Sequence, residues 1–379
     1  MNCGNGRQHP IGYGLLGCGG FGRFCLEQYG SMFSLERVAV ADADPGRAES
    51  AAAQHGLEAC TVDELLARED VDLVHVATPP FTHRELVERA LRAGKHVLCE
   101  KPLATNLEDA RAMVDLAGEL KRILAVNLIM RYDPLCAAVK TIVDERLLGE
   151  PLHGYFENYA KDEPLPAGHW FWDAEQSGGI FVEHGVHFFD LFAWWLGPGA
   201  VTAAQQIERP GAGLVDQVNC TALYGELPVP VNFYHGFTQP GRMDRQELRL
   251  VFERGSITLF DWVPTRARID ALLDAETLKR LRALAPGPEP EALELYAGED
   301  RRCAGRHREI EVDGRYSIVL ETGTDKLRLY GHVLRGLMAD QLAAVDNPGH
   351  ARRVSENNGI SSLEMAARAR QLAGGAGAR

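Results

Sequence analysis

The sequence predicts two domains: an α/β domain at the amino terminus, then an α+β domain with a mainly antiparallel sheet. A chain of 379 residues is long for a single hydrophobic core. Up to about residue 128, short apolar runs alternate with helical stretches, which is typical of parallel βαβ units. From residue 152, short strands with alternating polar and apolar residues indicate antiparallel hairpins.

We place the domain limits at residues 10–128 and 129–373, and we expect disorder at residues 1–9 and 374–379. The last helices could pack back on the first domain. The net charge of −13 argues against nucleic acid or an anionic membrane surface as a partner. The sequence contains no run of 18 apolar residues, so no membrane span is predicted. The first ten residues lack the apolar core of a signal peptide. The eight cysteines are scattered without a Cys-x-x-Cys pair, which favours reduced thiols in the cytoplasm.

The first domain is expected to contain five strands joined by helices. A capping-box spacing between Thr61 and Glu64 marks the start of one short helix, and Pro45 marks the start of another. The strands are predicted at residues 11–16, 37–41, 73–77, 96–99 and 123–127. The longer helices are predicted from the glycines after residue 16 to Tyr29 and at residues 45–55, 84–93 and 107–120.

A glycine-rich turn follows the first strand and opens the first helix. Its motif, G-x-G-x-x-G, permits a tight turn, close approach of a pyrophosphate to the backbone, and close packing of helix on strand. This context predicts a dinucleotide-binding Rossmann domain. The residues assigned to the cofactor loop are Gly17, Gly19, Gly20, Phe21 and Gly22.

Asp42 ends the second strand, twenty residues after Gly22, where an acid that binds the adenosine ribose is expected. Its carboxylate would accept hydrogen bonds from the ribose diol and repel a 2′-phosphate, which favours NAD over NADP. Asp44 would add to the repulsion, whereas Arg47 could attract a phosphate. Helix capping is the alternative role for Asp42.

Two further segments carry a resemblance to a known family. They are AGKHVLCEKPLA at residues 93–104 and VATPPFTH at residues 76–83. Together with the glycine loop they resemble the Gfo/Idh/MocA family of NAD(P)-dependent oxidoreductases over nearly the whole chain. By this resemblance, Lys101 lies beside the nicotinamide and hydrogen-bonds the reacting oxygen, and the Lys101–Pro102 peptide is often cis. The alternative for Lys101 is a solvated surface lysine, which its place at the end of a strand disfavours.

The same resemblance implies further contacts with the cofactor. Thr78 and Pro79 would lie by its ribose and nicotinamide, and Asn127 would contact cofactor or substrate. Arg131 is favoured as a structural ion-pair partner. His83 is expected to cap or brace the helix that follows it, and a chemical role in the reaction is less favoured. The complete cofactor set on this side is Thr78, Pro79, His83, Glu100, Lys101 and Asn127.

In the second domain, strands are predicted at residues 152–159, 201–208, 217–224, 229–237, 247–252 and 256–260. Residues 265–286 are expected to form a charged helical insertion, part of a longer segment, 265–310, whose role is open. Two helices, at residues 326–345 and 360–373, close the chain. The resemblance implies an open, mainly antiparallel sheet with one face beside the active site. Its other face would form a homodimer or homotetramer.

A helix is also predicted over residues 178–197, GGIFVEHGVHFFDLFAWWLG. On an α-helix, residues four apart share a face, so Glu183 and His187 lie together, and Asp190 continues the stripe. His184 is rotated by about 100° and points elsewhere. A paired, partly desolvated carboxylate and imidazole suit proton removal from an alcohol as hydride leaves carbon.

By the resemblance, His187 is the general acid/base, and position 183 holds its acidic helper. This chain departs from the family by carrying Glu183 where aspartate is commoner, which bears on the substrate more than on the chemistry. Two alternatives stay open for the cluster: a structural polar seam and a metal site. The spacing matches neither H-E-x-x-H nor H-x-x-E-H, so no metal is predicted. Possible substrate contacts, besides Lys101 and His187, are Tyr155, Trp172, His184, His235 and Tyr330.

The expected function is oxidation of a secondary hydroxyl of a cyclic polyol or sugar, with NAD as hydride acceptor. Lys101 would polarise the oxygen, His187 would take the proton and Glu183 would assist. The alternatives are a redox-neutral epimerase or eliminase that uses bound NAD, and a nucleotide-sensing regulator. A sensor needs the glycine loop but no proton-transfer pair, so Lys101 and His187 argue against it.

Overall fold

The computed structural model describes residues 9–161, 165–166, 168–306 and 308–375, in two compact units. The first unit takes in the described residues of Met1–Ile129, Ala167–Asp190 and Gly331–Ala367. The second takes in those of Met130–Pro166, Leu191–Tyr330 and Arg368–Arg379. The expected disorder at residues 1–9 and 374–379 falls mostly outside the described residues, and the last helix extends to Gly375.

The first unit is built on a parallel six-stranded sheet in the order β3-β2-β1-β4-β5-β6. This is the order of a doubly wound dinucleotide-binding domain, with its switch point between β1 and β4. The strands are β1 (Ile11–Leu16), β2 (Leu35–Ala41), β3 (Glu58–Ala59), β4 (Leu73–Val76), β5 (His96–Cys99) and β6 (Leu124–Val126). The helices between them are α1 (Gly20–Tyr29), α2 (Pro45–His55), α3 (Val62–Ala67), α4 (His83–Arg92) and α5 (Leu107–Glu119).

The predicted elements of this unit are confirmed. β1 and β4 are buried along their whole length, because helices cover both faces of a parallel sheet. Thr61 and Glu64 form the expected capping box at the start of α3. The two-residue strand β3 was not expected, because so short a pairing leaves no pattern in the sequence.

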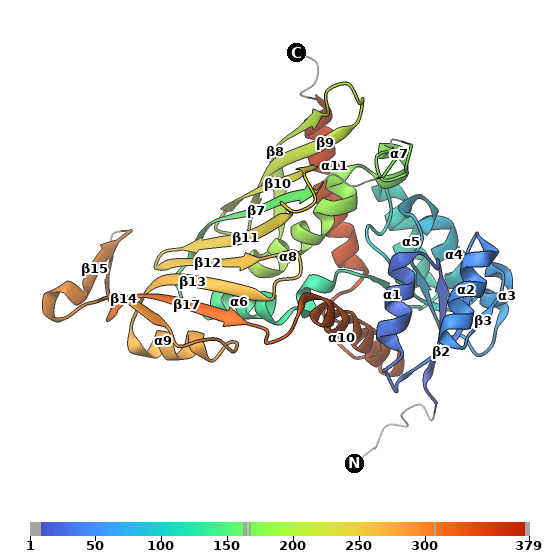
Figure 1. The fold of residues 1–379 in the computed structure, drawn as a ribbon, viewed down its shortest axis with the longest axis horizontal. Helices are drawn as coiled ribbons and strands as arrows, with labels where there is room; N and C mark the ends of the chain where they lie inside the picture. The colour runs from blue at the N-terminus through green and yellow to red at the C-terminus, as the bar shows by residue number, and fades with distance from the viewer. Residues whose placement is uncertain (1–8, 162–164, 167, 307, 376–379) are drawn as a thin grey trace. The chain divides into compact units, whose positions relative to one another are not determined.

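The second unit contains a nine-stranded sheet in the order β14-β17-β13-β12-β11-β7-β10-β9-β8 (Figure 1). Only the β7–β10 pair is parallel, so the mainly antiparallel sheet is confirmed. The six predicted strands are β7 (Pro151–Lys161), β8 (Gly199–Glu208), β9 (Val215–Tyr224), β10 (Val229–Gln239), β11 (Arg245–Phe252) and β12 (Gly255–Phe260). The others are β13 (Arg266–Leu273), β14 (Glu291–Leu295) and β17 (Gly314–Glu321), with β15 (Arg302–Gly305) and β16 (Arg308–Glu311) as a separate pair.

The helical insertion predicted at residues 265–286 is wrong in its first half. Residues 266–273 form β13, which lies inside the sheet between β12 and β17. Its sequence, RARIDALL, buries alternate residues, Ala267, Ile269, Ala271 and Leu273, which is a strand pattern concealed by its charges. Only α9 (Ala275–Arg282) is helical.

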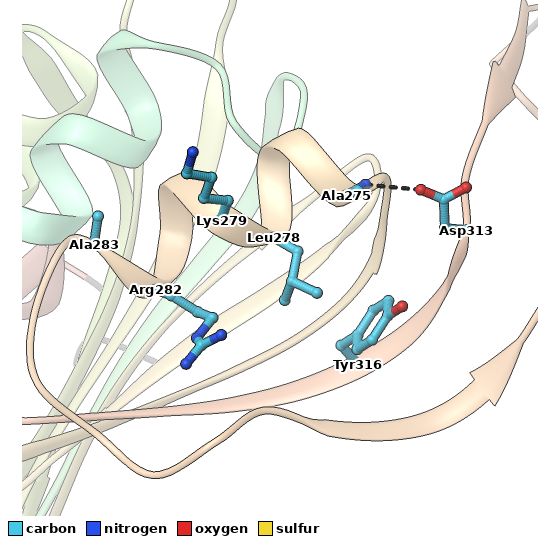
Figure 2. Close-up of a pocket in the computed structure, with 7 residues that line it drawn as sticks. All are labelled: Ala275, Leu278, Lys279, Arg282, Ala283, Asp313 and Tyr316. Atoms are coloured by element: carbon cyan, nitrogen blue, oxygen red, sulfur yellow. Dashed lines mark hydrogen bonds between the residues drawn. The ribbon is translucent and has the colours of Figure 1, made fainter.

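α9 lies against β17 beside a shallow hollow (Figure 2). Asp313 accepts a hydrogen bond from the N–H of Ala275, the first residue of α9, at 2.8 Å. Leu278 points toward Tyr316 on β17, whereas Lys279 points to the opposite side of the helix. The charged residues that suggested a long helix therefore belong to the exposed faces of a strand and of a short helix.

The single helix predicted over residues 178–197 is divided. α7 (Ala174–Ser177) ends at Gly178, and both Gly178 and Gly179 have positive φ, 80° and 79°, which an α-helix does not allow. A π-helical turn follows at Phe181–Gly185, and α8 covers Val186–Leu196. The remaining helices are α6 (Pro134–Asp144), α10 (Lys326–Asp346) and α11 (Glu356–Gly375).

Within the described part of the chain, no helix is both long and apolar enough to span a bilayer. The seven described cysteines are all free thiols. Five of them are buried, as free cysteines often are in protein cores.

One buried acid generates a test of stability. Asp133 is the N-cap of α6: its Oδ1 accepts hydrogen bonds from the N–H groups of Leu135 (2.8 Å) and Cys136 (3.0 Å). Only 1% of the residue is exposed, and burial raises its pKa from 3.8 to about 7. Between these values the folded state binds more protons than the unfolded state. The free energy of unfolding should therefore fall as pH rises from about 4 to 7.

We predict that Asp133→Asn removes this loss, because asparagine retains the capping oxygen without the charge. Relative to wild type, the variant should gain up to about 4 kcal/mol between pH 4 and pH 8, measured by urea denaturation. The control is Asp274→Asn, since Asp274 caps α9 with a lowered pKa, and its contribution should be lost as pH falls. An Asp133→Asn difference that does not change with pH would contradict the prediction.

Candidate active site at the carboxyl edge of the parallel sheet

The candidate residues of the first unit follow the carboxyl ends of five parallel strands. The glycine loop follows β1, Asp42 follows β2, Thr78 and Pro79 follow β4, Glu100 and Lys101 follow β5, and Asn127 follows β6. Carboxyl ends of parallel strands meet at one edge of the sheet, where α/β proteins bind ligands. The sheet topology therefore gathers residues that are far apart in the sequence.

The glycines of the loop have different structural requirements. Gly17 has φ of +99°, and a Cβ there would lie 2.3 Å from the carbonyl oxygen of Ala77. A Cβ on Gly22 would lie 2.0 Å from the carbonyl oxygen of Gly17. In contrast, a Cβ on Gly19 would meet no atom within 4 Å. Gly17 and Gly22 are thus required by the fold itself, whereas the space over Gly19 is open for a ligand.

Asp42 is tied to this loop. One carboxylate oxygen accepts a hydrogen bond from the N–H of Cys18 at 2.7 Å, and the other accepts from the N–H of Asp44 at 2.9 Å. Asp44, not Asp42, is the N-cap of α2, so the alternative role of helix capping belongs to the neighbouring acid. The side chain of Arg47 pairs with Asp44 at 3.5 Å on the surface.

Lys101 and Glu183 form an ion pair. The Nζ atom of Lys101 donates to the Glu183 carboxylate at 2.6 Å and to the Glu183 backbone carbonyl at 2.8 Å. Their side chains are 19% and 12% exposed, so the pair is largely withdrawn from water. The Lys101–Pro102 peptide is cis, as the resemblance implied. An ammonium has three donors, and two of those of Lys101 are directed at Glu183.

The partner segment is the π-helical turn Phe181–Gly185, which contains Glu183. A π-helical turn shifts the backbone hydrogen bond from four residues to five and is frequent at functional sites. His184, in the same turn, stacks on Phe188 with ring centroids 5.9 Å apart. Burial, followed by the charge of Lys101, lowers the pKa of His184 to about 3. His184 is therefore a neutral imidazole at physiological pH.

His187 lies in the first turn of α8 and is 3% exposed, with its ring edge-on to Phe188 at 6.3 Å. Asp190 is buried one turn further along the helix. The predicted spacing of Glu183 and His187 now spans the junction between a π-helical turn and an α-helix. The prediction of a shared face for these two residues assumed an α-helix throughout. The rotation of about 100° per residue does not hold in the π-helical turn.

Two family models match the chain, each over a different segment. Residues 11–128 match the model described as oxidoreductase family, NAD-binding Rossmann fold, and residues 136–258 match the GFO/IDH/MocA C-terminal domain. Inositol 2-dehydrogenase 2 from Saccharopolyspora erythraea is 34% identical over 276 residues, which are 68% of this chain and 76% of that protein. The chain belongs to the GFO/IDH/MocA family of oxidoreductases.

Inositol 2-dehydrogenase from Rhizobium meliloti is 35% identical over 199 residues, or 52% of this chain. The match spans 59% of that relative's length, which is less than two thirds. Among solved structures, a putative myo-inositol dehydrogenase from Sinorhizobium meliloti 1021 is similar in fold. Its TM-score is 0.70 at 24% sequence identity, covering 97% of this chain and 98% of that one. The predicted family and fold class are thus confirmed, and the first unit is an NAD(P)-binding Rossmann domain.

Some of the predicted substrate residues lie apart from one another in the structure. Within the second unit, Tyr155 and His235 lie on opposite faces of the sheet. The hydroxyl of Tyr155 donates to Glu247 at 2.5 Å, whereas His235 is fully buried against the ring of Phe156 at 5.0 Å. These two side chains therefore cannot line one pocket on a single face.

The other two aromatic candidates have aromatic neighbours. In the first unit, Trp172 packs edge-on against Phe171, with ring centroids 4.7 Å apart. In the second unit, Tyr330 contacts the ring of Trp262 in the same manner at 5.4 Å. These contacts are compatible with core packing, and neither tyrosine nor tryptophan gains a substrate role from them.

A group behind the site was missed by the sequence interpretation. His75, on β4, lies between Tyr13 on β1 and Glu100, with both ring nitrogens in hydrogen bonds of 2.9 and 2.8 Å. A histidine within the apolar strand LVHV was the available signal. Cys25 lies nearby, and Cys25, His75 and Glu100 are the one group of three potential metal ligands among the described residues. Burial raises the pKa of the Cys25 thiol well above its usual value, which disfavours the thiolate that would bind a metal.

We predict that Gly19→Ala and Gly22→Ala separate binding from folding. Gly19→Ala should retain the wild-type melting temperature, because its methyl group meets no protein atom, and should weaken NAD binding at least tenfold by occupying the space for the pyrophosphate. Gly22→Ala should lower the melting temperature by several degrees, because its methyl group meets the Gly17 carbonyl. Calorimetric titration and thermal denaturation measure both effects, and unaltered NAD affinity in Gly19→Ala would contradict the assignment of the loop.

Proposed function

We propose that this protein is an NAD-dependent dehydrogenase that oxidises a secondary hydroxyl of a cyclic polyol or sugar, such as an inositol or a pyranose. The observation that carries the proposal is the largely buried ion pair of Lys101 and Glu183 at the ligand-binding edge of a Rossmann sheet. Family membership and the inositol dehydrogenases among the relatives support the substrate class. A regulator that only binds a nucleotide would not need this pair, because withdrawing its two ions from water costs several kcal/mol per ion before their attraction offsets that cost.

When bound, NAD supplies the hydride acceptor. In the proposed mechanism, Lys101 directs its remaining N–H to the substrate oxygen and stabilises the negative charge that develops there. Glu183 holds the ammonium in place through two hydrogen bonds. His187 accepts the hydroxyl proton as the C–H bond breaks. His184, a neutral imidazole, contributes shape and hydrogen bonding to the pocket, not a charge.

Three features of the first unit support NAD as the cofactor. Glycines leave open the space over the loop, and α1 starts there with no acidic residue in its first turn, so its N–H groups suit a pyrophosphate. Thr78, Pro79 and Asn127 are proposed to contact the nicotinamide half, since they follow the strands of the second mononucleotide-binding half. Asp42 is proposed to bind the adenosine ribose.

We further propose that one face of the nine-stranded sheet, the face that carries Tyr155, joins copies of the chain into a homodimer or homotetramer. Strand alternation places Tyr155 and Tyr159 of β7 and Tyr234 of β10 on this face, all partly exposed. Tyrosine is enriched in the cores of protein interfaces, where its ring is buried and its hydroxyl finds a partner.

The proposal predicts that the purified chain reduces NAD in the presence of at least one member of a panel of inositols and pyranoses. His187→Ala should lower kcat by about 10²- to 10⁴-fold, the contribution of general base catalysis, with little change in the Kd for NAD. Absorbance of NADH at saturating NAD measures the rate, and EDTA in every assay should leave it unchanged. Wild-type rates in His187→Ala would remove the histidine from the mechanism, and loss of activity restored by zinc would favour a metal site.

Cofactor choice gives a second test. The Asp42 carboxylate should repel the 2′-phosphate of NADP, so the wild-type chain should prefer NAD. Asp42→Asn retains an oxygen for the N–H of Cys18 but removes the charge, and it should narrow the ratio of NAD to NADP affinity by at least tenfold. The control is Asp44→Asn, on the same loop, which should change the ratio less. An unchanged ratio in Asp42→Asn would place the discrimination elsewhere.

A further inference from the structure

Two buried histidines hold the residues on either side of Lys101. His75 bonds to Glu100, the residue before it, and His83 bonds to Pro102, the residue after it. We propose that His75 and His83 are positioning residues that fix the Glu100–Pro102 turn, so that Lys101 meets Glu183 and the substrate in one geometry. This inference rests on the proposed function for the role of Lys101 in the reaction.

The first of these contacts is the end of a hydrogen-bonded chain across three strands. The Tyr13 hydroxyl on β1 meets Nδ1 of His75 on β4 at 2.9 Å, and Nε2 of His75 meets Oε1 of Glu100 at 2.8 Å. The same Oε1 accepts from the side-chain amide of Asn127 at 2.8 Å. Tyr13 and His75 are fully buried, and Glu100 is 8% exposed.

The directions of these bonds can be deduced from the donors. Burial raises the pKa of Tyr13 well above its usual value, so its hydroxyl keeps a proton and can donate to Nδ1. Nε2 of His75 then carries the imidazole proton and donates to Glu100. Glu100 accepts two bonds at one oxygen, as a carboxylate does. In this arrangement His75 accepts from Tyr13 at Nδ1 and donates to Glu100 from Nε2.

His83 acts on the other side of the turn. It is the first residue of α4 and is fully buried, with Nδ1 2.9 Å from the Pro102 carbonyl oxygen and Nε2 2.9 Å from the Thr78 carbonyl oxygen. Both partners only accept hydrogen bonds. Burial lowers the pKa of His83, so its ring is neutral and its single N–H donates to one of the two carbonyls at a time. Through these two contacts His83 links the loop after β4, which carries Thr78, to the loop after β5, which carries Lys101.

These contacts matter because Lys101 has a distant partner. Glu183 lies 82 residues further along the chain, and Lys101 reaches both its carboxylate and its backbone carbonyl. A displacement of about 1 Å at a catalytic group can cost roughly 100-fold in rate. A turn held by hydrogen bonds at the residues before and after Lys101 restricts such a displacement, which packing of an apolar residue at 75 or 83 would not do.

Amide side chains of two lengths provide the test. An asparagine amide can replace Nδ1 of a histidine, and a glutamine amide can replace Nε2. Thus His75→Gln keeps the bond to Glu100 and His75→Asn loses it, whereas His83→Asn keeps the bond to Pro102 and His83→Gln loses it. The inference predicts kcat within about threefold of wild type for His75→Gln and His83→Asn, and a decrease of roughly 10- to 100-fold for His75→Asn and His83→Gln.

The assay uses the full-length chain with saturating NAD and myo-inositol, or the most active member of the polyol panel. His83→Asn, which releases Thr78, should instead raise the Kd for NAD by about 2- to 12-fold, the effect of one hydrogen bond. His96→Asn and His96→Gln are the controls. His96 is the first residue of β5, the strand that precedes Lys101, and it accepts a hydrogen bond from the N–H of Ile123. Both should keep the wild-type kcat.

A general loss of packing would affect both amides alike at each position. Equal kcat values for Asn and Gln at position 75 and at position 83 would therefore overturn the inference, as would the same preferred amide at both. Nitrogen-15 NMR of wild type and Tyr13→Phe gives a readout that needs neither turnover nor a variant of either histidine. His75 protonated at Nε2 in wild type, and no longer fixed in that tautomer in Tyr13→Phe, supports the chain, and protonation at Nδ1 overturns it. A wild-type protein without activity on any polyol would contradict the proposed function, and the NMR result would still decide the inference.

Discussion

The ion pair between Lys101 and Glu183 is the interaction on which the candidate site depends. It joins the end of a parallel strand to a π-helical turn 82 residues later, with hydrogen bonds of 2.6 and 2.8 Å. Removing one partner of a buried pair leaves an uncompensated charge, at a cost of about 3–5 kcal/mol. The pair therefore fixes the segment that carries Glu183, His184 and His187 against the cofactor-binding sheet within one compact unit.

The sheet topology explains why such a pair can exist at this place. The order β3-β2-β1-β4-β5-β6 brings the glycine loop, Asp42, Thr78, Lys101 and Asn127 to one edge, although they span more than a hundred residues of sequence. Parallel strands that are buried on both faces leave the ends of the strands as the place for polar chemistry. Behind this edge, the buried His75 bonds to Glu100 and the buried His83 bonds to the Pro102 carbonyl, while Tyr13 bonds to His75.

The second unit shows how composition can conceal structure. Residues 266–273 contain two arginines and an aspartate, yet they form an interior strand of the nine-stranded sheet because alternate residues are small or aliphatic and buried. The charge of that segment belongs to one face only. A periodicity of two was the informative signal, and net charge was not.

The sequence by itself determined the family and the main strands and helices of the first domain. Glycines at fixed spacing, alternating strands and helices, and the segments around Lys101 and residues 76–83 identified the Rossmann domain, its cofactor loop and the GFO/IDH/MocA resemblance, because these signals depend on neighbouring residues. Only the tertiary structure decided three other features: the pairing of Lys101 with Glu183, the π-helical turn, and the histidines that flank Lys101. It also separated Tyr155 from His235 on opposite faces of one sheet. These features depend on groups brought together from distant segments, and no local pattern encodes which of several polar residues will meet once the chain has folded.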